Sequence, residues 1–256
     1  MDLSGKIVLI TGASSGIGTA CADAFARLGC RLLLAARRGD RLQALAARLE
    51  EEFGAEVLAA SLDVRDRAAV DAWVTGIPDE WRAIDILVNN AGLARGLAPV
   101  QEGEISDWEE MIDTNLKGLL FVTRAVIPGM VARGSGHLIN IGSIAGHEVY
   151  PLGNVYCATK HAVAALTRAM GIDTLGTGLR VSSVDPGMVE TEFSLVRFHG
   201  DAERAQAAYA GFEALRPEDV ADAVVFCATR PTHANVREMV LMPSAQAAAV
   251  HAHRTG

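Results

Sequence analysis

The sequence predicts an α/β fold in which one doubly wound sheet of seven parallel strands carries helices on both faces. Three observations lead to this prediction: short apolar runs alternate with longer amphipathic stretches, a glycine-rich turn joins the first run to the first helical stretch, and half of the 256 residues are hydrophobic. A chain of this length and composition can bury a large core. We therefore expect a single domain that comprises residues 1–256.

The predicted strands are short runs rich in aliphatic side chains. The first of them, residues 7–10, is apolar at every position, which is typical of a strand buried on both faces. The full set covers residues 7–10, 31–35, 56–62, 85–89, 137–141, 179–184 and 239–242. Because helix-sized stretches separate the strands, we expect right-handed crossovers between parallel neighbours.

The predicted helices are identified by apolar spacing and by the residues at their ends. They cover residues 16–28, 40–52, 68–74, 106–133 and 154–175, and a late helix begins at Pro217. Gly29 is a typical helix stop, and proline suits the first position of a helix. Ser106 and Glu109 have the spacing of a capping box, which predicts that the fourth helix starts there.

Composition and charge argue against several classes of protein. The net charge of −8, with no basic block, is unsuited to binding nucleic acid. No apolar run approaches the roughly 20 residues that span a bilayer, so we expect no membrane partner. The first residues lead directly into a strand without the pattern of a secretory leader, and we expect a cytoplasmic protein.

Neither the cysteines nor the histidines have the spacing of a metal site. We expect no metal, and we expect the four cysteines to be reduced thiols in a cytoplasmic chain. These cysteines are Cys21, Cys30, Cys157 and Cys227.

The turn after the first strand has three glycines at the spacing of a dinucleotide-binding motif. Gly12 permits a sharp turn, Gly16 lets a phosphate approach the backbone, and Gly18 allows close packing of helix on strand. The start of the following helix favours an anion. A tight turn without a ligand is the alternative, but the position between strand and helix favours a dinucleotide.

The end of the second strand indicates which dinucleotide binds. It reads Ala35, Ala36, Arg37, Arg38, with no carboxylate before Asp40 that could accept hydrogen bonds from the ribose of NAD. Guanidinium groups suit the 2′-phosphate of NADP. The alternative is a solvated basic loop end, since a further arginine follows. We predict NADP.

Three residues with acid–base chemistry converge on the same edge of the predicted sheet. Ser143 follows the fifth strand, and Tyr156 and Lys160 are one helical turn apart. Each alone would usually be a cap or a surface residue. The pKa of a free tyrosine is about 10, and a nearby cation such as Lys160 would lower it, so that Tyr156 could act as a general acid and base.

The chain resembles the short-chain dehydrogenase/reductase family, whose members have a Rossmann fold. The matching pieces, in the family's order, are Thr11-Gly-x-x-x-Gly-Ile-Gly18, Asn89-Asn-Ala-Gly92, Asn115, Ser143, Tyr156-x-x-x-Lys160 and Pro186-Gly187. The resemblance implies a catalytic set in which Tyr156 exchanges the proton, Lys160 also binds the nicotinamide ribose and Ser143 holds the substrate oxygen. It implies that Asn115 interrupts its helix and holds a water that links Lys160 to solvent.

Together these arguments assign the cofactor contacts. They are Gly12, Ser14, Ser15, Gly16, Ile17, Gly18, Arg37, Arg38, Asp63, Val64, Asn89, Ala91, Gly92, Tyr156, Lys160, Pro186, Gly187, Val189 and Thr191.

Further sequence segments resemble one branch of the family, the NADP-dependent serine and 3-hydroxy acid dehydrogenases. These segments include residues 84–93, 108–115, 191–194 and 196–198. The resemblance implies oxidation of serine or of acids like 3-hydroxypropionate, and reduction of malonic semialdehyde in reverse. Two alternatives stay open: an NADP-dependent reductase of another aldehyde, ketone or sugar alcohol, and a non-catalytic protein that senses NADP.

A substrate carboxylate would need a fixed cation beside the reactive carbon. The resemblance makes residues 188–215 a substrate-covering loop and helix, which contains Arg197, and Arg95 is the rival. Ser143 and Tyr150 complete the predicted substrate side. A solvated surface position is the alternative for either arginine.

Two further expectations concern the ends and the assembly of the chain. The tail of residues 244–256 is either an ordered arm or a frayed end. The family resemblance implies a homotetramer in which the helices of residues 106–133 and 154–175 pack against their copies.

Overall fold

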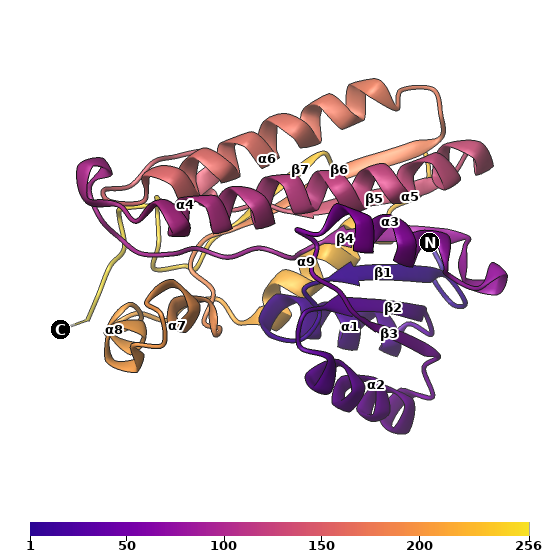
Figure 1. Cartoon of the computed structure of the whole chain (residues 1–256), viewed down its shortest axis with the longest axis horizontal. Coiled ribbons are helices and arrows are strands. Elements are labelled where there is room, and N and C mark those ends of the chain that lie inside the picture. The colour runs from indigo at the N-terminus through magenta and orange to yellow at the C-terminus, as the bar shows by residue number, and fades with distance from the viewer. Residues whose placement is uncertain (256) are drawn as a thin grey trace.

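The computed structural model describes residues 1–255, so that Gly256 of the predicted tail lies outside the described residues. The strands are β1 (Ile7–Thr11), β2 (Arg31–Ala36), β3 (Val57–Ser61), β4 (Ile84–Asn89), β5 (Gly136–Ile141), β6 (Leu179–Pro186) and β7 (Glu238–Leu241). They form one parallel sheet in the order β3-β2-β1-β4-β5-β6-β7 (Figure 1). This arrangement confirms the predicted fold class.

Helices cover both faces of the sheet, as predicted. One face carries α1 (Gly16–Arg27), α2 (Gly39–Phe53) and α9 (Pro217–Ala228), and the other carries α3 (Arg67–Thr75), α5 (Leu119–Arg133) and α6 (Asn154–Asp173). Val8 and Ile10 of β1 belong to the first core, and Ile7 and Leu9 belong to the second. Since side chains alternate along a strand, a strand buried on both faces is apolar at every position.

The sheet topology places a binding site beside β1. This strand pairs with β2 on one side and with β4 on the other, so the order of strands reverses there. Ligands bind outside the carboxyl ends of strands at such a switch point. The helices α7 (Phe193–Arg197) and α8 (Ala202–Ala207) lie beyond these ends of the sheet (Figure 1, left).

The predicted capping box is wrong. Helix α4 (Ile105–Ile112) begins one residue before Ser106, and Glu104 at the N-cap makes no side-chain cap bond. Ser106 is already helical and therefore cannot cap the helix from outside. The predicted single helix is also interrupted, because a π-helical segment, Asp113–Gly118, separates α4 from α5. Asn115 lies within this segment, where the resemblance implied an interruption.

The helical stretch Ile105–Arg133 is long and apolar. By length and composition it is the one candidate for a membrane span among residues 1–255, with a mean hydropathy of 1.2 in its most apolar window. Its buried side chains, which include Leu119, Val122, Val126 and Met130, pack against the sheet. Its inner side is thus part of the protein core.

The described part of the C-terminal tail is an ordered arm. The backbone N–H of Met188 donates to Oε1 of Gln246 at 2.9 Å, and the N–H of Thr255 donates to the carbonyl of Gly211 at 2.9 Å. The arm therefore packs on the segment of residues 188–215, which carries α7 and α8.

Candidate active site

A cleft of about 610 Å³ lies at the carboxyl ends of the central strands. It brings together Ser143, which follows β5, and the α6 residues Tyr156 and Lys160. The predicted cofactor residues that line it are Gly12, Ser14, Ser15, Gly16, Ile17, Arg37, Arg38, Asp63, Val64, Ala91, Gly92, Tyr156, Lys160, Pro186, Gly187, Val189 and Thr191.

The glycine turn forms a close-fitting cradle at one end of the cleft. Gly12 has a φ of +66°, and a side chain there would place its Cβ 2.9 Å from the Cα of Ala91. The Asn90 side chain braces the turn, because its Nδ2 donates to the carbonyls of Thr11 (2.9 Å) and Gly12 (3.2 Å). At the N-cap of α1, Ser15 makes no side-chain cap bond, which leaves the first-turn N–H groups available to a phosphate.

Arg38 is the basic side chain most closely built into this end of the cleft. Its Nε donates to Ser14 Oγ at 3.2 Å and one terminal nitrogen donates to Ser15 Oγ at 2.6 Å. Arg37 also lines the cleft, but it is half exposed and makes a long ion pair of 3.4 Å with Glu110. This donor set fits a 2′-phosphate, with Arg38 better fixed than Arg37.

Two predicted cofactor residues do not line the cleft. Asn89 is buried below it, where its Nδ2 donates to Thr123 Oγ1 and Asn140 Oδ1, both at 2.9 Å. Its neighbour Asn90 lines the cleft instead, since adjacent strand residues point to opposite sides. Gly18 lies in α1, where a side chain would collide with the carbonyl of Gly12. It permits the close packing predicted for it, without lining the cleft.

The catalytic candidates are buried and held in place by hydrogen bonds. The Lys160 ammonium donates to the carbonyl of Ile141 at 2.9 Å. Ser143 Oγ accepts from the N–H of Ala145 at 3.1 Å, so its own proton remains free to be donated to a substrate oxygen. Tyr156 lies between these two side chains and α7, and its ring meets Phe193 edge-on with 5.6 Å between centroids.

Asn115 is tied into the wall of the site by its side chain. Its Oδ1 accepts from the N–H of Leu93 at 2.8 Å, and its Nδ2 donates to the carbonyl of Leu93 at 2.8 Å and to Thr159 Oγ1 at 3.1 Å. These bonds connect the interrupted helix to the strand-end motif. That Asn115 holds a water stays a prediction.

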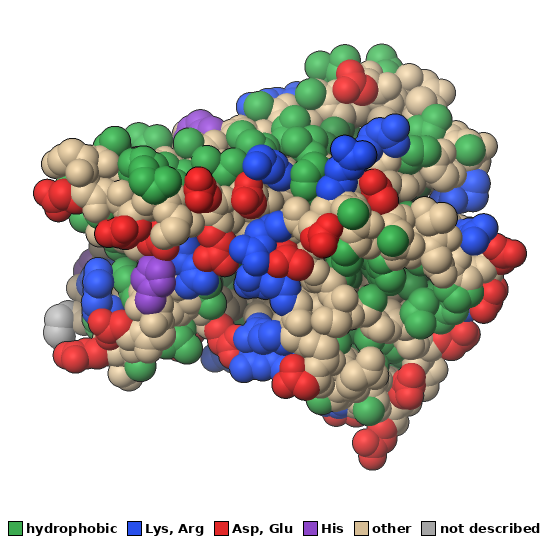
Figure 2. All heavy atoms as spheres, viewed as in Figure 1, with side chains coloured by type: hydrophobic (Ala, Val, Ile, Leu, Met, Phe, Trp, Pro, Cys, Tyr) green, Lys and Arg blue, Asp and Glu red, His purple; other side chains and the backbone are tan. Residues whose placement is uncertain are grey.

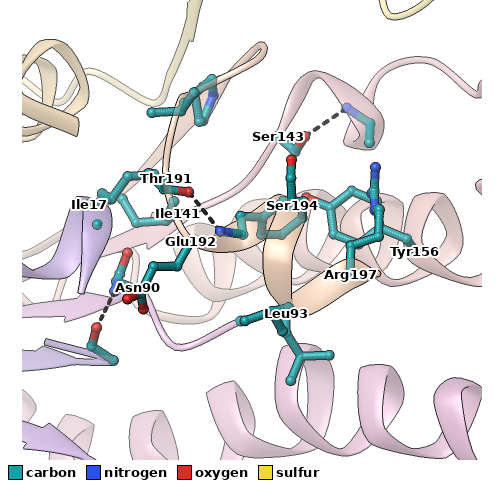
Figure 3. A pocket seen from close by; sticks show the side chains of 18 of the residues that line it. Ile17, Asn90, Leu93, Ile141, Ser143, Tyr156, Thr191, Glu192, Ser194 and Arg197 are labelled. Atoms are coloured by element: carbon teal, nitrogen blue, oxygen red, sulfur yellow. Dashed lines mark hydrogen bonds between the residues drawn. The ribbon is translucent and has the colours of Figure 1, made fainter. Parts of the chain in front are cut away.

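Arg197 points into the cleft beside Tyr156 (Figure 3). One terminal nitrogen donates to the Tyr150 hydroxyl at 2.7 Å. Its Nε is buried and has no hydrogen-bond partner within the described chain. The guanidinium group as a whole lines the cleft, and its positive charge favours an anion there.

The charge of Arg197 also acts on Tyr156. The pKa of the Tyr156 phenol lies above its ordinary value, because burial raises it more than the positive charge of Arg197 and the hydroxyl of Ser143 lower it. Burial lowers the pKa of Lys160 to about 8, against the charge of Asp185. That Lys160 lowers the pKa of Tyr156 stays a prediction. In this structure the Lys160 ammonium donates to the Ile141 carbonyl, and its Nζ lies 5.9 Å from the ring centre of Tyr156.

Arg95, the predicted rival of Arg197, does not line the cleft. Its Nε pairs with Glu110 at 2.6 Å, and a terminal nitrogen donates to the carbonyl of Val196 at 2.6 Å. These bonds fix the loop that carries α7. Of the two arginines, Arg197 is the one that the structure leaves facing the substrate side with Ser143 and Tyr150.

Several lining residues were not singled out from the sequence. They include Asn90, Glu192, Phe193, Ser194, Tyr209 and Gln246. Asn90 lies inside a motif that was recognised. Glu192 and Phe193 precede Arg197 in the same substrate segment, and this proximity was the available signal. Gln246 comes from the tail, and nothing in its local sequence indicates that the tail returns to the cleft.

One group of metal-ligating side chains is assembled from three distant segments. The Nε2 of His147 lies 2.8 Å from Asp185 Oδ2 and 3.6 Å from Glu238 Oε1. Spacing along the sequence could not reveal this group. Arg168 lies 3.8 Å from the same Glu238 oxygen, so the charges of the group are paired with one another.

Known proteins resemble this chain along nearly its whole length. The family model for short chain dehydrogenase matches residues 6–200. The chain is 49% identical over 251 residues to the NADP-dependent 3-hydroxy acid dehydrogenase YdfG of Salmonella typhimurium. The aligned region covers 97% of this chain and 100% of the relative. It is 44% identical over 253 residues to the NADP-dependent 3-hydroxy acid dehydrogenase of Schizosaccharomyces pombe, over 98% of both chains. The closed form of serine dehydrogenase complexed with NADP⁺ matches with a TM-score of 0.91 at 47% identity, over 97% of this chain and 100% of that one.

Proposed function

This chain belongs to the short-chain dehydrogenase family, and we propose that it is an NADP-dependent oxidoreductase of small 3-hydroxy acids. Its substrates are acids such as serine or 3-hydroxypropionate, oxidised at the 3-hydroxyl, and in the reverse direction malonic semialdehyde. The relatives named for this activity are 44–49% identical to it. The observation that carries the proposal is the Arg197 guanidinium group, which lines the cleft beside Tyr156.

The cofactor site supports NADP. The glycine turn and the first turn of α1 would hold the pyrophosphate, and Arg38 would hold the 2′-phosphate. Lys160 and Tyr156 would hold the nicotinamide ribose, as the family resemblance implies. When bound, NADP supplies the hydride acceptor for oxidation and the hydride donor for reduction.

Proton transfer is assigned to Tyr156. In oxidation, its phenolate takes the proton of the substrate 3-hydroxyl, and in reduction its phenol returns that proton to the carbonyl oxygen. The phenolate is stabilised by the positive charge of Arg197 and by the Ser143 hydroxyl. Ser143 donates a hydrogen bond to the same substrate oxygen, which places the oxygen between the two hydroxyl groups.

The carboxylate of the substrate is assigned to Arg197. A substrate anion that leaves water for the cleft requires a cation of fixed position. Arg197 is fixed by the Tyr150 hydroxyl and by the rings around it, since its guanidinium carbon lies 5.7 Å from the Tyr150 ring centre and 5.1 Å from that of Phe193. This contact distinguishes an acid from a neutral alcohol or aldehyde.

A reductase of neutral aldehydes, ketones or sugar alcohols is the second candidate, because the same Tyr156, Ser143 and Lys160 would serve it. An assay of NADP reduction with a panel of 3-hydroxy acids and neutral alcohols decides between them. Preference for acids supports the proposal, and equal rates support the second candidate. Binding of NADP without turnover of any substrate would instead indicate a sensing protein.

We propose a cytoplasmic homotetramer with a two-fold contact at its centre. Hydrophobic side chains gather over the helices along the upper side of the molecule (Figure 2). Exposed ones on α4, α5 and α6 are Ile105, Ile112, Leu120, Val131 and Ile172. Exposed apolar groups on neighbouring helices are typical of a protein interface. The four cysteines are free and buried, which suits a reducing compartment.

A further inference from the structure

Glu192 joins two arginines at the cofactor end of the cleft. Its Oε2 lies 2.8 Å from a terminal nitrogen of Arg38, and its Oε1 lies 2.8 Å from a terminal nitrogen of Arg41. The hydrogen bonds to these two guanidinium groups lower the pKa of Glu192, so it is a carboxylate at neutral pH. Acidic and basic side chains alternate on this face of the molecule (Figure 2).

Arg38 has few donors to spare. Its Nε is held by Ser14 Oγ, one terminal nitrogen by Ser15 Oγ, and the other by Glu192. The proposed function assigns the 2′-phosphate of NADP to this same guanidinium group. A phosphate and a carboxylate on one cation repel each other, so the Glu192 carboxylate opposes binding of the phosphate to Arg38.

Glu192 belongs to the segment that covers the substrate. Its neighbour Thr191 lies over the glycine turn, since a Cβ on Gly16 would approach Thr191 Cγ2 to 3.1 Å. Glu192 is also the N-cap residue of α7, whose last residue is Arg197. Figure 3 shows Glu192 on the side of Ile17 and Asn90, whereas Arg197 lies beside Tyr156. The Glu192 ion pairs therefore tie the substrate segment to the cofactor end of the cleft.

We propose that Glu192 sets the affinity for NADP by competing with its 2′-phosphate for Arg38. The proposal rests on NADP being the cofactor. Binding of NADP opens the ion pair between Glu192 and Arg38, whereas binding of NAD, which has no 2′-phosphate, leaves it closed. Loss of the Glu192 charge is then expected to strengthen NADP binding and to leave NAD binding unchanged.

The test is a calorimetric titration of NADP and NAD into wild type and Glu192→Gln. Glu190→Gln is the matched control, because Glu190 is exposed, lies in the same segment and makes no ion pair within the described residues. We expect Glu192→Gln to bind NADP about three- to tenfold more tightly. The variant lacks the partly exposed ion pair between Glu192 and Arg38, so binding of the phosphate no longer has to disrupt it. NAD binding is expected to change less than twofold in both variants, and so is NADP binding by Glu190→Gln.

A second probe isolates the phosphate. Adenosine 2′,5′-bisphosphate is expected to gain affinity for Glu192→Gln by the same factor, whereas adenosine 5′-monophosphate gains none. Thermal unfolding of each variant shows whether it is folded. If wild type prefers NADP to NAD, but Glu192→Gln binds NADP and the bisphosphate no more tightly than wild type does, the proposed role of Glu192 is contradicted. If wild type binds NAD as tightly as NADP, the cofactor assignment fails as well.

Discussion

The guanidinium carbon of Arg197 lies 5.2 Å from the ring centre of Tyr156, closer than the Lys160 ammonium at 5.9 Å. Arg197 thus faces two anions in the proposed reaction, the substrate carboxylate and the Tyr156 phenolate. Its charge binds one and stabilises the other. The consequences for pH dependence and for substrate choice can be measured separately.

Replacement of Arg197 by Gln is expected to shift the pH profile of oxidation. Because the charge of Arg197 lowers the pKa of Tyr156, its removal raises that pKa, and the phenolate then forms only at higher pH. The rising limb of kcat against pH is expected to move toward alkaline pH, with a neutral alcohol as substrate so that carboxylate binding does not contribute. A limb that stays in place or moves toward acid would contradict this role.

Tyr156→Phe tests the proton transfer. The ring remains to pack against Phe193, but the hydroxyl that exchanges the proton is lost. We expect kcat to fall about 10²- to 10⁴-fold, the usual contribution of a positioned acid or base. Affinity for NADP, measured by titration, should hardly change. Substantial turnover by this variant would assign the proton transfer to another group.

Replacement of Arg38 and of Arg37 separates their contributions to cofactor choice. Arg38 is held by two serine hydroxyls at the glycine turn, whereas Arg37 is half exposed. We expect Arg38→Ala to weaken NADP on the order of tenfold or more, as loss of a charge-assisted contact does, and Arg37→Ala to weaken it less. The double variant should lose still more affinity for NADP and little for NAD. Equal losses for both cofactors would show that the arginines do not hold the phosphate.

The sheet and its helices could be predicted because apolar runs and glycine stops are local properties. The sequence also predicted that the motif residues lie together, because the carboxyl ends of parallel strands lie at the same edge of the sheet. The sequence did not show which of the two asparagines faces the cleft: Asn90 lines it, whereas the Asn89 side chain is buried against Thr123 and Asn140. The choice between Arg95 and Arg197 depends on Glu110 and on the carbonyl of Val196, contacts that no sequence pattern encodes.

The proposed tetramer predicts the mass in solution. Light scattering at micromolar concentration is expected to give four times the 27.0 kDa of the chain, because the exposed apolar side chains of α4, α5 and α6 would be covered by copies. Replacing Leu120 and Val131 by Lys should reduce this mass while the sheet, to which neither contributes, stays folded. A monomeric mass for wild type would count against the assembly.

The central claim is that Arg197 selects an acid, and the most direct test compares two substrates of nearly equal size. The measurement is kcat/KM with NADP for 3-hydroxypropionate and for propane-1,3-diol, in wild type and in Arg197→Gln. A charge-assisted hydrogen bond contributes about 1.5–3 kcal/mol, so wild type is expected to prefer the acid by about 10- to 100-fold. In Arg197→Gln this preference should disappear, chiefly through KM of the acid. Equal efficiency of wild type toward both substrates, or an undiminished preference in the variant, would contradict the account.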